Sequence, residues 1–222
     1  MRLPLYVEAN NRSILLVGGG GEATRRALKF LRAGASVRVL SKWFSPELEE
    51  AAERGKLELI RGEAKDEELL RPLVSSSDLI IIATDDEEAN NLIYDMGRRL
   101  GKLINLVTDA DKTDVVVPFE ASVAGLRITV TSEGKSGLVV RDALDKIVDL
   151  LERDREIPIL LESMHYLKRE LKKVLGDARK RIRAYKAVYN DPTFRELVQN
   201  ENVEKAKRYA LEVALERFNP ES

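Results

Sequence analysis

Four consecutive glycines, Gly18 to Gly21, follow the apolar run "SILLV" and precede a stretch with helical spacing. Glycine is costly to order and supplies no side chain to pack, so this run indicates special backbone angles or close approach to another group. Gly18, Gly20 and Ala23 occupy the small-residue positions of a G-x-G-x-x-G/A fingerprint. Between a strand and a helix, this spacing predicts binding of a dinucleotide pyrophosphate by free amides at the helix N-terminus. A purely structural glycine turn is the alternative.

The second β-rich run, "SVRVLSKW", ends without the acidic residue that usually contacts the adenosine ribose of such a ligand. Ser41, Lys42 and Trp43 stand there instead, and we expect them to belong to the cofactor-binding set. A lysine is compatible with a 2′-phosphate, so these residues leave both NAD and NADP open. Lys42 could equally be a solvated loop charge.

Two later apolar runs also end in polar residues. "DLIIIATDDEEANN" places Thr84 and Asp85 after one run, and "KLINLVTDADKTD" places Thr108 and Asp109 after the other. Ligands of doubly wound sheets bind outside the carboxyl ends of the strands, so we expect Thr84 and Asp85 along the nicotinamide side of the cofactor. A carboxylate of the later loop could take the proton that accompanies hydride transfer. As the structural alternatives, Thr84 or an Asp caps a helix that begins at Glu87, and Asx turns account for the aspartates of the later loop.

Composition excludes several classes of protein and of site. The chain has 222 residues, with 37 Lys and Arg against 38 Asp and Glu, so its net charge of -1 predicts neither a nucleic-acid nor a membrane partner. Cysteine is absent and His165 is the one histidine, which excludes disulfides, thiolate metal sites and histidine-rich metal centres. No apolar run approaches the roughly 20 residues that span a bilayer, and the first residues lack a signal-peptide core, so we expect a cytoplasmic protein.

Alternating β-rich and helical segments must position these residues. In the first half, apolar strands alternate with amphipathic helices, which predicts an α/β, Rossmann-like doubly wound parallel sheet with helices on both faces. Next, "DVVVPFEASVAGLRITVTSEG" contains two β-branched runs joined by a turn, a pair that needs a partner for stability. The remainder is charged and helical, with breaks at Gly176 and at Asn190 to Pro192. The expected parts are an NAD-binding domain (1–113), a small β dimerisation region (114–150) and a helical C-terminal domain (151–222).

Several segments together resemble the precorrin-2 dehydrogenases, a family that includes the N-terminal part of siroheme synthases and the yeast bifunctional dehydrogenase-chelatase. The resemblance rests on "LPLYVEANNRSILLVGGGGEATRRALKFLRAGASVRVLS", "FSPELEE", "IIATDDEEANN" and "VPFEASVAGLRITVTSEGKSGLVVRDAL". These segments stand in the family's order, and the helical tail matches more loosely. The resemblance implies NAD as cofactor, oxidation of precorrin-2 to sirohydrochlorin, and an intertwined homodimer in which Val115 to Thr131 crosses between subunits.

The resemblance also implies roles for individual residues of the cofactor site. Gly21 and Glu22 match the family's cofactor-contacting pair after the glycine turn. Lys42 with Trp43 matches the pair after the second strand.

Near the tetrapyrrole, Ser132 matches a serine of the family's S-x-G-x-S-P stretch, in which Gly137 here replaces the usual proline. Precorrin-2 bears many carboxylates, so we expect cations close to the named loops to bind it. The candidates are Arg12, Lys135 and Arg141, with Ser132 beside them.

The loop after the fifth strand departs from the family. Members usually read N-V-x-D there, with an aspartate held important for dehydrogenation and chelation, whereas this chain reads Asn105-Leu106-Val107-Thr108 and then Asp109. Thr108 takes the aspartate's place when the residues are counted without gaps, and we expect Asp109 to act as the catalytic base. Two other functions stay open: an enzyme that also inserts ferrous iron, and a non-catalytic NAD-sensing module resembling the ligand-binding domains of potassium channels.

Overall fold

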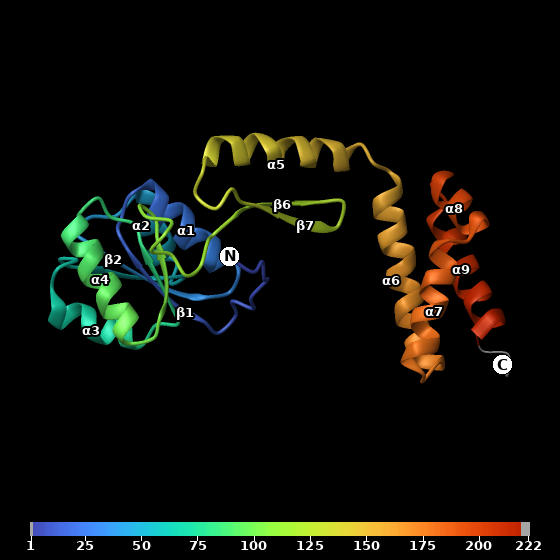
Figure 1. The fold of residues 1–222 in the computed structure, drawn as a ribbon, viewed down its shortest axis with the longest axis horizontal. Coiled ribbons are helices and arrows are strands. Elements are labelled where there is room, and N and C mark those ends of the chain that lie inside the picture. Colours follow the sequence, from blue (N-terminus) through green and yellow to red (C-terminus); the bar gives the residue numbers. More distant parts are fainter. Residues whose placement is uncertain (1, 219–222) are drawn as a thin grey trace. The chain divides into compact units, whose positions relative to one another are not determined.

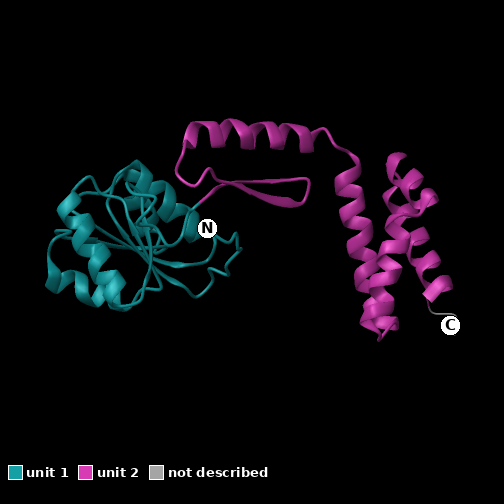
Figure 2. Ribbon diagram, in the orientation of Figure 1, with its two compact units in different colours: residues 1–117 teal, residues 118–222 magenta. Residues whose placement is uncertain are grey.

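A computed structural model of the protein describes residues 2–218. The chain divides into two compact units, Met1–Val117 and Pro118–Ser222 (Figures 1 and 2). The finer division into three parts that the sequence suggests stays a prediction.

Unit 1 is built on a five-stranded parallel sheet with the strand order β3-β2-β1-β4-β5. The order reverses beside β1, which leaves a topological switch point where ligands of such sheets bind at the carboxyl ends of the strands. The predicted Rossmann-like fold is therefore confirmed. The strands are β1 (Ser13–Val17), β2 (Ser36–Ser41), β3 (Glu58–Arg61), β4 (Leu79–Ile82) and β5 (Leu103–Leu106).

Alternate side chains of the central strands enter two separate cores. On β1, Leu15 and Val17 pack with residues of α3 (Glu67–Ser75) and α4 (Glu87–Arg99). Ile14 and Leu16 pack on the other face with residues of α1 (Gly21–Arg32) and α2 (Pro46–Glu53). Because helices cover both faces, the strand must be apolar at every position rather than at every second one.

Helices α2, α3 and α4 each begin at a residue whose side chain caps the first turn. Ser45, Asp66 and Asp86 accept a hydrogen bond from a backbone amide three residues later. The predicted start of α4 at Glu87 is confirmed, with Asp86 rather than Thr84 as its cap. Helix α1 differs, because its N-cap residue, Gly20, has no side chain that could accept such a bond.

Unit 2 begins with a two-stranded antiparallel hairpin of β6 (Phe119–Val123) and β7 (Leu126–Val130). Its turn residues, Ala124 and Gly125, have φ angles of 52° and 77°, as a two-residue turn with two positive φ angles requires. Helix α5 (Gly137–Glu152) runs along the hairpin and packs on both strands (Figure 1). The helix therefore supplies apolar contacts that an isolated pair of strands lacks.

Four further helices form the rest of unit 2 within the described residues, and buried Leu167, Ala184, Phe194 and Ala210 meet in their core. The predicted breaks are confirmed, since chain reversals at Gly176 and at 190–192 separate α6 from α7 and α7 from α8. No helix in the described part of the chain is long and apolar enough to cross a bilayer. The helices are α6 (Glu156–Val174), α7 (Ala178–Tyr189), α8 (Pro192–Gln199) and α9 (Val203–Phe218).

Asp191 fixes the start of α8 against α9. Its carboxylate accepts hydrogen bonds from the amides of Thr193 and Phe194 at 3.0 and 3.2 Å, and from the hydroxyl of Tyr209 at 3.0 Å. Arg217 lies 3.2 Å away, and the residue is only 7% exposed. Burial opposes ionisation, but the bonds from the Phe194 amide and the Tyr209 hydroxyl hold the pKa of Asp191 below its ordinary value.

Replacing Asp191 with Ala is expected to lower the free energy of unfolding by about 2–3 kcal/mol, because a cap and a buried acceptor are lost together. Asp177→Ala, at the exposed cap of α7, should cost about 1 kcal/mol. Urea unfolding followed by circular dichroism measures both.

Because the folded-state pKa of Asp191 is lowered, its contribution should be complete above about pH 4 and disappear as the pH falls further. Equal costs for the two caps, or an Asp191→Ala cost that persists at low pH, would contradict this role.

Candidate functional site

Two of the four glycines are required by the packing of the chain itself. Gly18 has a φ of 125°, and a Cβ there would lie 2.2 Å from the carbonyl oxygen of Ala83 at the end of β4. A Cβ on Gly19 would lie 1.9 Å from the carbonyl oxygen of Trp43, just beyond β2. These glycines let the turn after β1 pass tightly between the ends of its two neighbouring strands.

The other two glycines are not required in this way. A Cβ on Gly20 would make only an ordinary contact of 3.6 Å with the Trp43 ring, and a Cβ on Gly21 would meet no described atom within 4 Å. Gly20 has a φ of −80°, which any residue adopts. They leave open surface at the uncapped N-terminus of α1, where first-turn amides point outward as donors. This open cradle is where the sequence predicts that a dinucleotide pyrophosphate binds.

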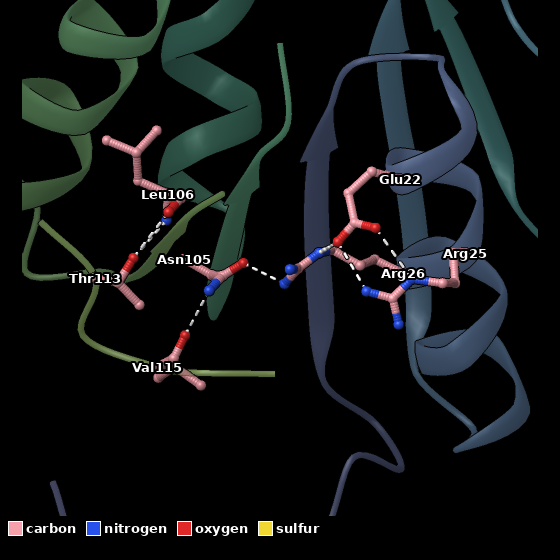
Figure 3. Close-up of polar contacts among 7 residues, drawn as sticks. All are labelled: Glu22, Arg25, Arg26, Asn105, Leu106, Thr113 and Val115. Carbon is pink, nitrogen blue, oxygen red and sulfur yellow. Dashed lines mark hydrogen bonds and ion pairs between the residues drawn. The ribbon is translucent and has the colours of Figure 1, made fainter. Parts of the chain in front are cut away.

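The charge of the first turn of α1 also suits an anion. Glu22 receives two bonds from Arg25, at 2.8 and 3.0 Å, and one from Arg26 Nε at 2.6 Å (Figure 3). Partial burial opposes ionisation of Glu22, but the bonds from Arg25 and Arg26 hold its pKa below the ordinary value. The three side chains together carry one net positive charge, so the carboxylate does not repel a pyrophosphate.

Arg26 connects this turn to β5. Its side chain is 10% exposed, and its Nη1 donates to Oδ1 of buried Asn105 at 2.5 Å. Nδ2 of Asn105 in turn donates to the carbonyl of Val115 at 2.7 Å (Figure 3). Burial lowers the pKa of Arg26, although its bond to Glu22 opposes this. Arg26 is not among the site residues predicted from the sequence. The one signal for it there is that a basic residue stands four positions after Glu22 on the same helix.

The loop after β5 is held by its own polar groups. The Thr113 hydroxyl accepts from the Leu106 amide at 3.0 Å (Figure 3). Oδ1 of Asp109 accepts from the amides of Asp111 and Lys112 at 2.9 and 3.2 Å, which is an Asx turn. Asp109 therefore forms the Asx turn that the sequence offered as a structural alternative. Its second carboxylate oxygen, Oδ2, has no hydrogen bond among the described residues. Thr108 is exposed.

The residues after β2 form an exposed group beside the glycine turn. Trp43 is 59% exposed, and its ring lies next to Gly20. Lys42 has a partner, since its Nζ lies 2.7 Å from Oε2 of Glu63. Ser41 points toward Gly19, because its Oγ would lie 2.8 Å from a Cβ there.

The end of β4 is braced by Thr84. Its hydroxyl donates to Oδ1 of Asn90 at 2.6 Å, and Nδ2 of Asn90 donates back to the Thr84 carbonyl at 3.0 Å. Asp85 is exposed. The carboxyl ends of β1, β2, β4 and β5 thus bring the predicted cofactor and catalytic residues to one edge of the sheet. They are Gly18, Gly20, Gly21, Glu22, Ala23, Ser41, Lys42, Trp43, Thr84, Asp85, Thr108 and Asp109.

The prediction that Arg12 lies close to the loops of the candidate site is wrong. Arg12 precedes β1 and donates at 3.5 Å to Asp78, which precedes β4. It therefore lies at the amino edge of the parallel sheet, opposite the loops that it was expected to join.

The other predicted substrate residues belong to unit 2. The Ser132 hydroxyl accepts from the Ser136 amide at 2.9 Å within the turn before α5. Lys135 is exposed in that turn, and the guanidinium of Arg141 lies 5.6 Å from the centre of the Phe119 ring. Their contact with a substrate stays a prediction.

Comparison with known proteins agrees with the glycine turn and the sheet. Residues 5–119, just over half of the chain, match the family described as "Putative NAD(P)-binding". The chain belongs to this family of dinucleotide-binding domains. Similarity to siroheme synthases extends further along the chain, so the resemblance expected from the sequence is confirmed.

The siroheme synthase of Actinobacillus pleuropneumoniae serotype 3 is 28% identical over 218 residues, which are 98% of this chain and 43% of that protein. Siroheme synthase 3 of Aeromonas hydrophila is 32% identical over 149 residues, or 67% of this chain and 31% of the relative. The chain thus spans less than half the length of these relatives. A solved structure named "SirC, precorrin-2 dehydrogenase" matches 94% of this chain and 100% of its own, with a TM-score of 0.70 and 21% identity, so the two share a fold.

Substitutions in the glycine run should separate folding from ligand binding. Gly18→Ala is expected to destabilise unit 1, because its Cβ would overlap backbone and its φ is positive. Gly21→Ala should leave thermal stability unchanged or slightly higher, yet weaken dinucleotide binding about tenfold or more by filling the cradle. Melting curves and nucleotide titrations distinguish these results. If Gly21→Ala binds the dinucleotide as tightly as the wild type does, the pyrophosphate does not bind at this turn.

Arg25 and Arg26 bind the same carboxylate and form a matched pair for a stability test. Arg26→Gln should cost about 2–3 kcal/mol of unfolding free energy, since Asn105 and Glu22 lose a buried partner. Arg25→Gln should cost less than about 1 kcal/mol, because its ion pair is partly exposed. Denaturant titrations of both variants give the comparison, and similar losses would show that Arg26 is not the connecting residue.

Proposed function

We propose that the chain is an NAD-dependent precorrin-2 dehydrogenase, which oxidises precorrin-2 to sirohydrochlorin. The observation that carries the proposal is the open, uncapped glycine turn of α1, in a chain that resembles siroheme synthases over 98% of its length. The shared fold with a protein named as a precorrin-2 dehydrogenase supports it. The activity of the longer relatives supplies the substrate class.

In this proposal the residues of unit 1 bind the cofactor and hold a proton acceptor. Amides of the first turn of α1 bind the pyrophosphate, and Trp43 and Ser41 lie where the adenosine passes. When bound, NAD supplies the acceptor for a hydride from the substrate. Oδ1 of Asp109 is engaged by the loop amides, so Oδ2 is the atom that accepts the accompanying proton.

The substrate contacts proposed for unit 2 follow from charge. Precorrin-2 carries acetate and propionate carboxylates, which guanidinium and ammonium groups bind by charge-assisted hydrogen bonds. Lys135 and Arg141 are exposed cations near the turn that Ser132 closes. We assign these three residues to the substrate.

A homodimer is part of the same proposal. On α5, Leu138 is 84% exposed and Leu150 is 70% exposed, and the helix lies on a sheet of only two strands among the described residues. Apolar side chains on such an element mark an interaction surface. A second copy of the chain that covers the hairpin and α5 would bury them.

The direct test incubates the purified protein anaerobically with precorrin-2 and NAD and follows reduced nicotinamide together with the sirohydrochlorin spectrum. Turnover establishes the dehydrogenase. Binding of NAD without turnover of precorrin-2 would refute the proposal and favour a nucleotide-sensing module.

Within that assay, Asp109→Asn isolates the proton acceptor, because an amide oxygen still accepts from the loop amides. We expect a fall in kcat of about 100-fold or more, with NAD affinity within about twofold of the wild type. Asp111→Asn, two residues further along the same loop and exposed, is the control and should keep full activity. If Asp109→Asn turns over at the wild-type rate, Asp109 is not the base, although the dehydrogenase assignment stands.

A further inference from the structure

An ion pair lies at the sheet edge beside the end of β2. Lys42 follows β2, Glu63 follows β3, and the two strands are neighbours in the parallel sheet. Nζ of Lys42 lies 2.7 Å from Oε2 of Glu63, and both side chains are exposed. The sheet therefore brings a carboxylate to the position where the sequence of β2 ends without one.

This position matters for cofactor choice. In doubly wound sheets the adenosine ribose lies at the carboxyl end of the second strand, where an acid contacts the 2′-hydroxyl of NAD and a cation contacts the 2′-phosphate of NADP. Lys42 by itself would attract that phosphate. Bound to Glu63, it is neutralised, and the carboxylate adds repulsion against a second anion.

Other charges at this edge do not replace Lys42. Arg61 donates from Nη1 to the carbonyl of Lys42 at 2.6 Å, and its guanidinium lies 5.2 Å from the centre of the Phe44 ring. Its Nη2 lies 3.8 Å from Glu49 of α2. The two cations and two carboxylates balance, so the loss of Glu63 alone leaves one positive charge centred on Lys42.

We propose that Glu63 sets the cofactor preference of this chain: by engaging Lys42 and placing a carboxylate beside the ribose, it favours NAD and excludes a 2′-phosphorylated dinucleotide. The inference rests on the proposed function for the use of a dinucleotide. It adds Glu63, a residue of the loop after β3 that lies outside the glycine turn and the β2 loop, and assigns it to specificity.

Trp43 provides the measurement, because it is the one tryptophan in the chain and its exposed ring lies beside Gly20. Titrating NAD and NADP against its fluorescence gives both dissociation constants without turnover. The wild type should bind NADP at least about tenfold more weakly than NAD. Glu63→Gln should tighten NADP binding about fivefold or more and change NAD binding by less than about twofold.

Two control variants identify the interaction. Glu49→Gln removes the same charge from the same edge but frees Arg61 rather than Lys42, and should leave the NADP to NAD ratio of dissociation constants unchanged. Adding Lys42→Met to Glu63→Gln should abolish the gain in NADP affinity. The gain should also shrink as salt is raised, since exposed charges are screened.

The proposal is overturned if Glu63→Gln leaves the ratio unchanged, or if Glu49→Gln changes it equally. If precorrin-2 is still oxidised, these outcomes do not affect the proposal that the chain is a dehydrogenase. Conversely, NAD binding without precorrin-2 turnover refutes the reaction but not the role of Glu63. If the wild type binds neither nucleotide, both proposals fail.

Discussion

The geometry of the candidate site depends on the hydrogen bonds that the buried guanidinium of Arg26 makes to Glu22 and Asn105. The carboxyl ends of parallel strands project separate loops, and backbone pairing within the sheet does not fix those loops relative to one another. Arg26 does so by donating hydrogen bonds to Glu22 on its own helix and to Asn105 on β5. Asn105 in turn donates to the Val115 carbonyl. A charge with so little exposure is tolerated because its partners satisfy it. The glycine turn and the loop that carries Asp109 thereby share one support.

Two of the four glycines are required by the fold, and the other two leave space for a ligand. Gly18 and Gly19 are demanded by the backbone of neighbouring strands, whereas Gly20 and Gly21 face space that no described atom fills closely. A fingerprint read from sequence treats such glycines alike. The contacts around each Cβ position separate the glycines that build the turn from those that keep its surface open. The open pair lies at the N-terminus of α1, which has no side-chain cap.

Local patterns predicted most of the fold, because strand and helix periodicity, caps and turns are encoded by neighbouring residues. The breaks near Gly176 and Asn190 and the start of α4 at Glu87 are of this kind. The contact between Arg26 and Asn105 was beyond such patterns, since it joins residues 79 positions apart. Arg12 was misplaced for a related reason. It is close in sequence to the glycine turn, but β1 carries the chain from one edge of the sheet to the other in between.

Buried and exposed ion pairs consequently have different roles in this unit. The hydrogen bonds of Arg26 connect the parts of the site. Replacing Arg26 would leave buried polar groups without partners, so the geometry of the fold requires this residue. The pair of Lys42 and Glu63 is exposed and contributes little to stability, because water solvates both charges when they are apart. Residues at that edge can therefore change with the charge of the ligand while the sheet and the glycine turn stay the same. The interior contacts fix the geometry of the site, and the proposed selectivity for one dinucleotide over another depends on the solvated pair.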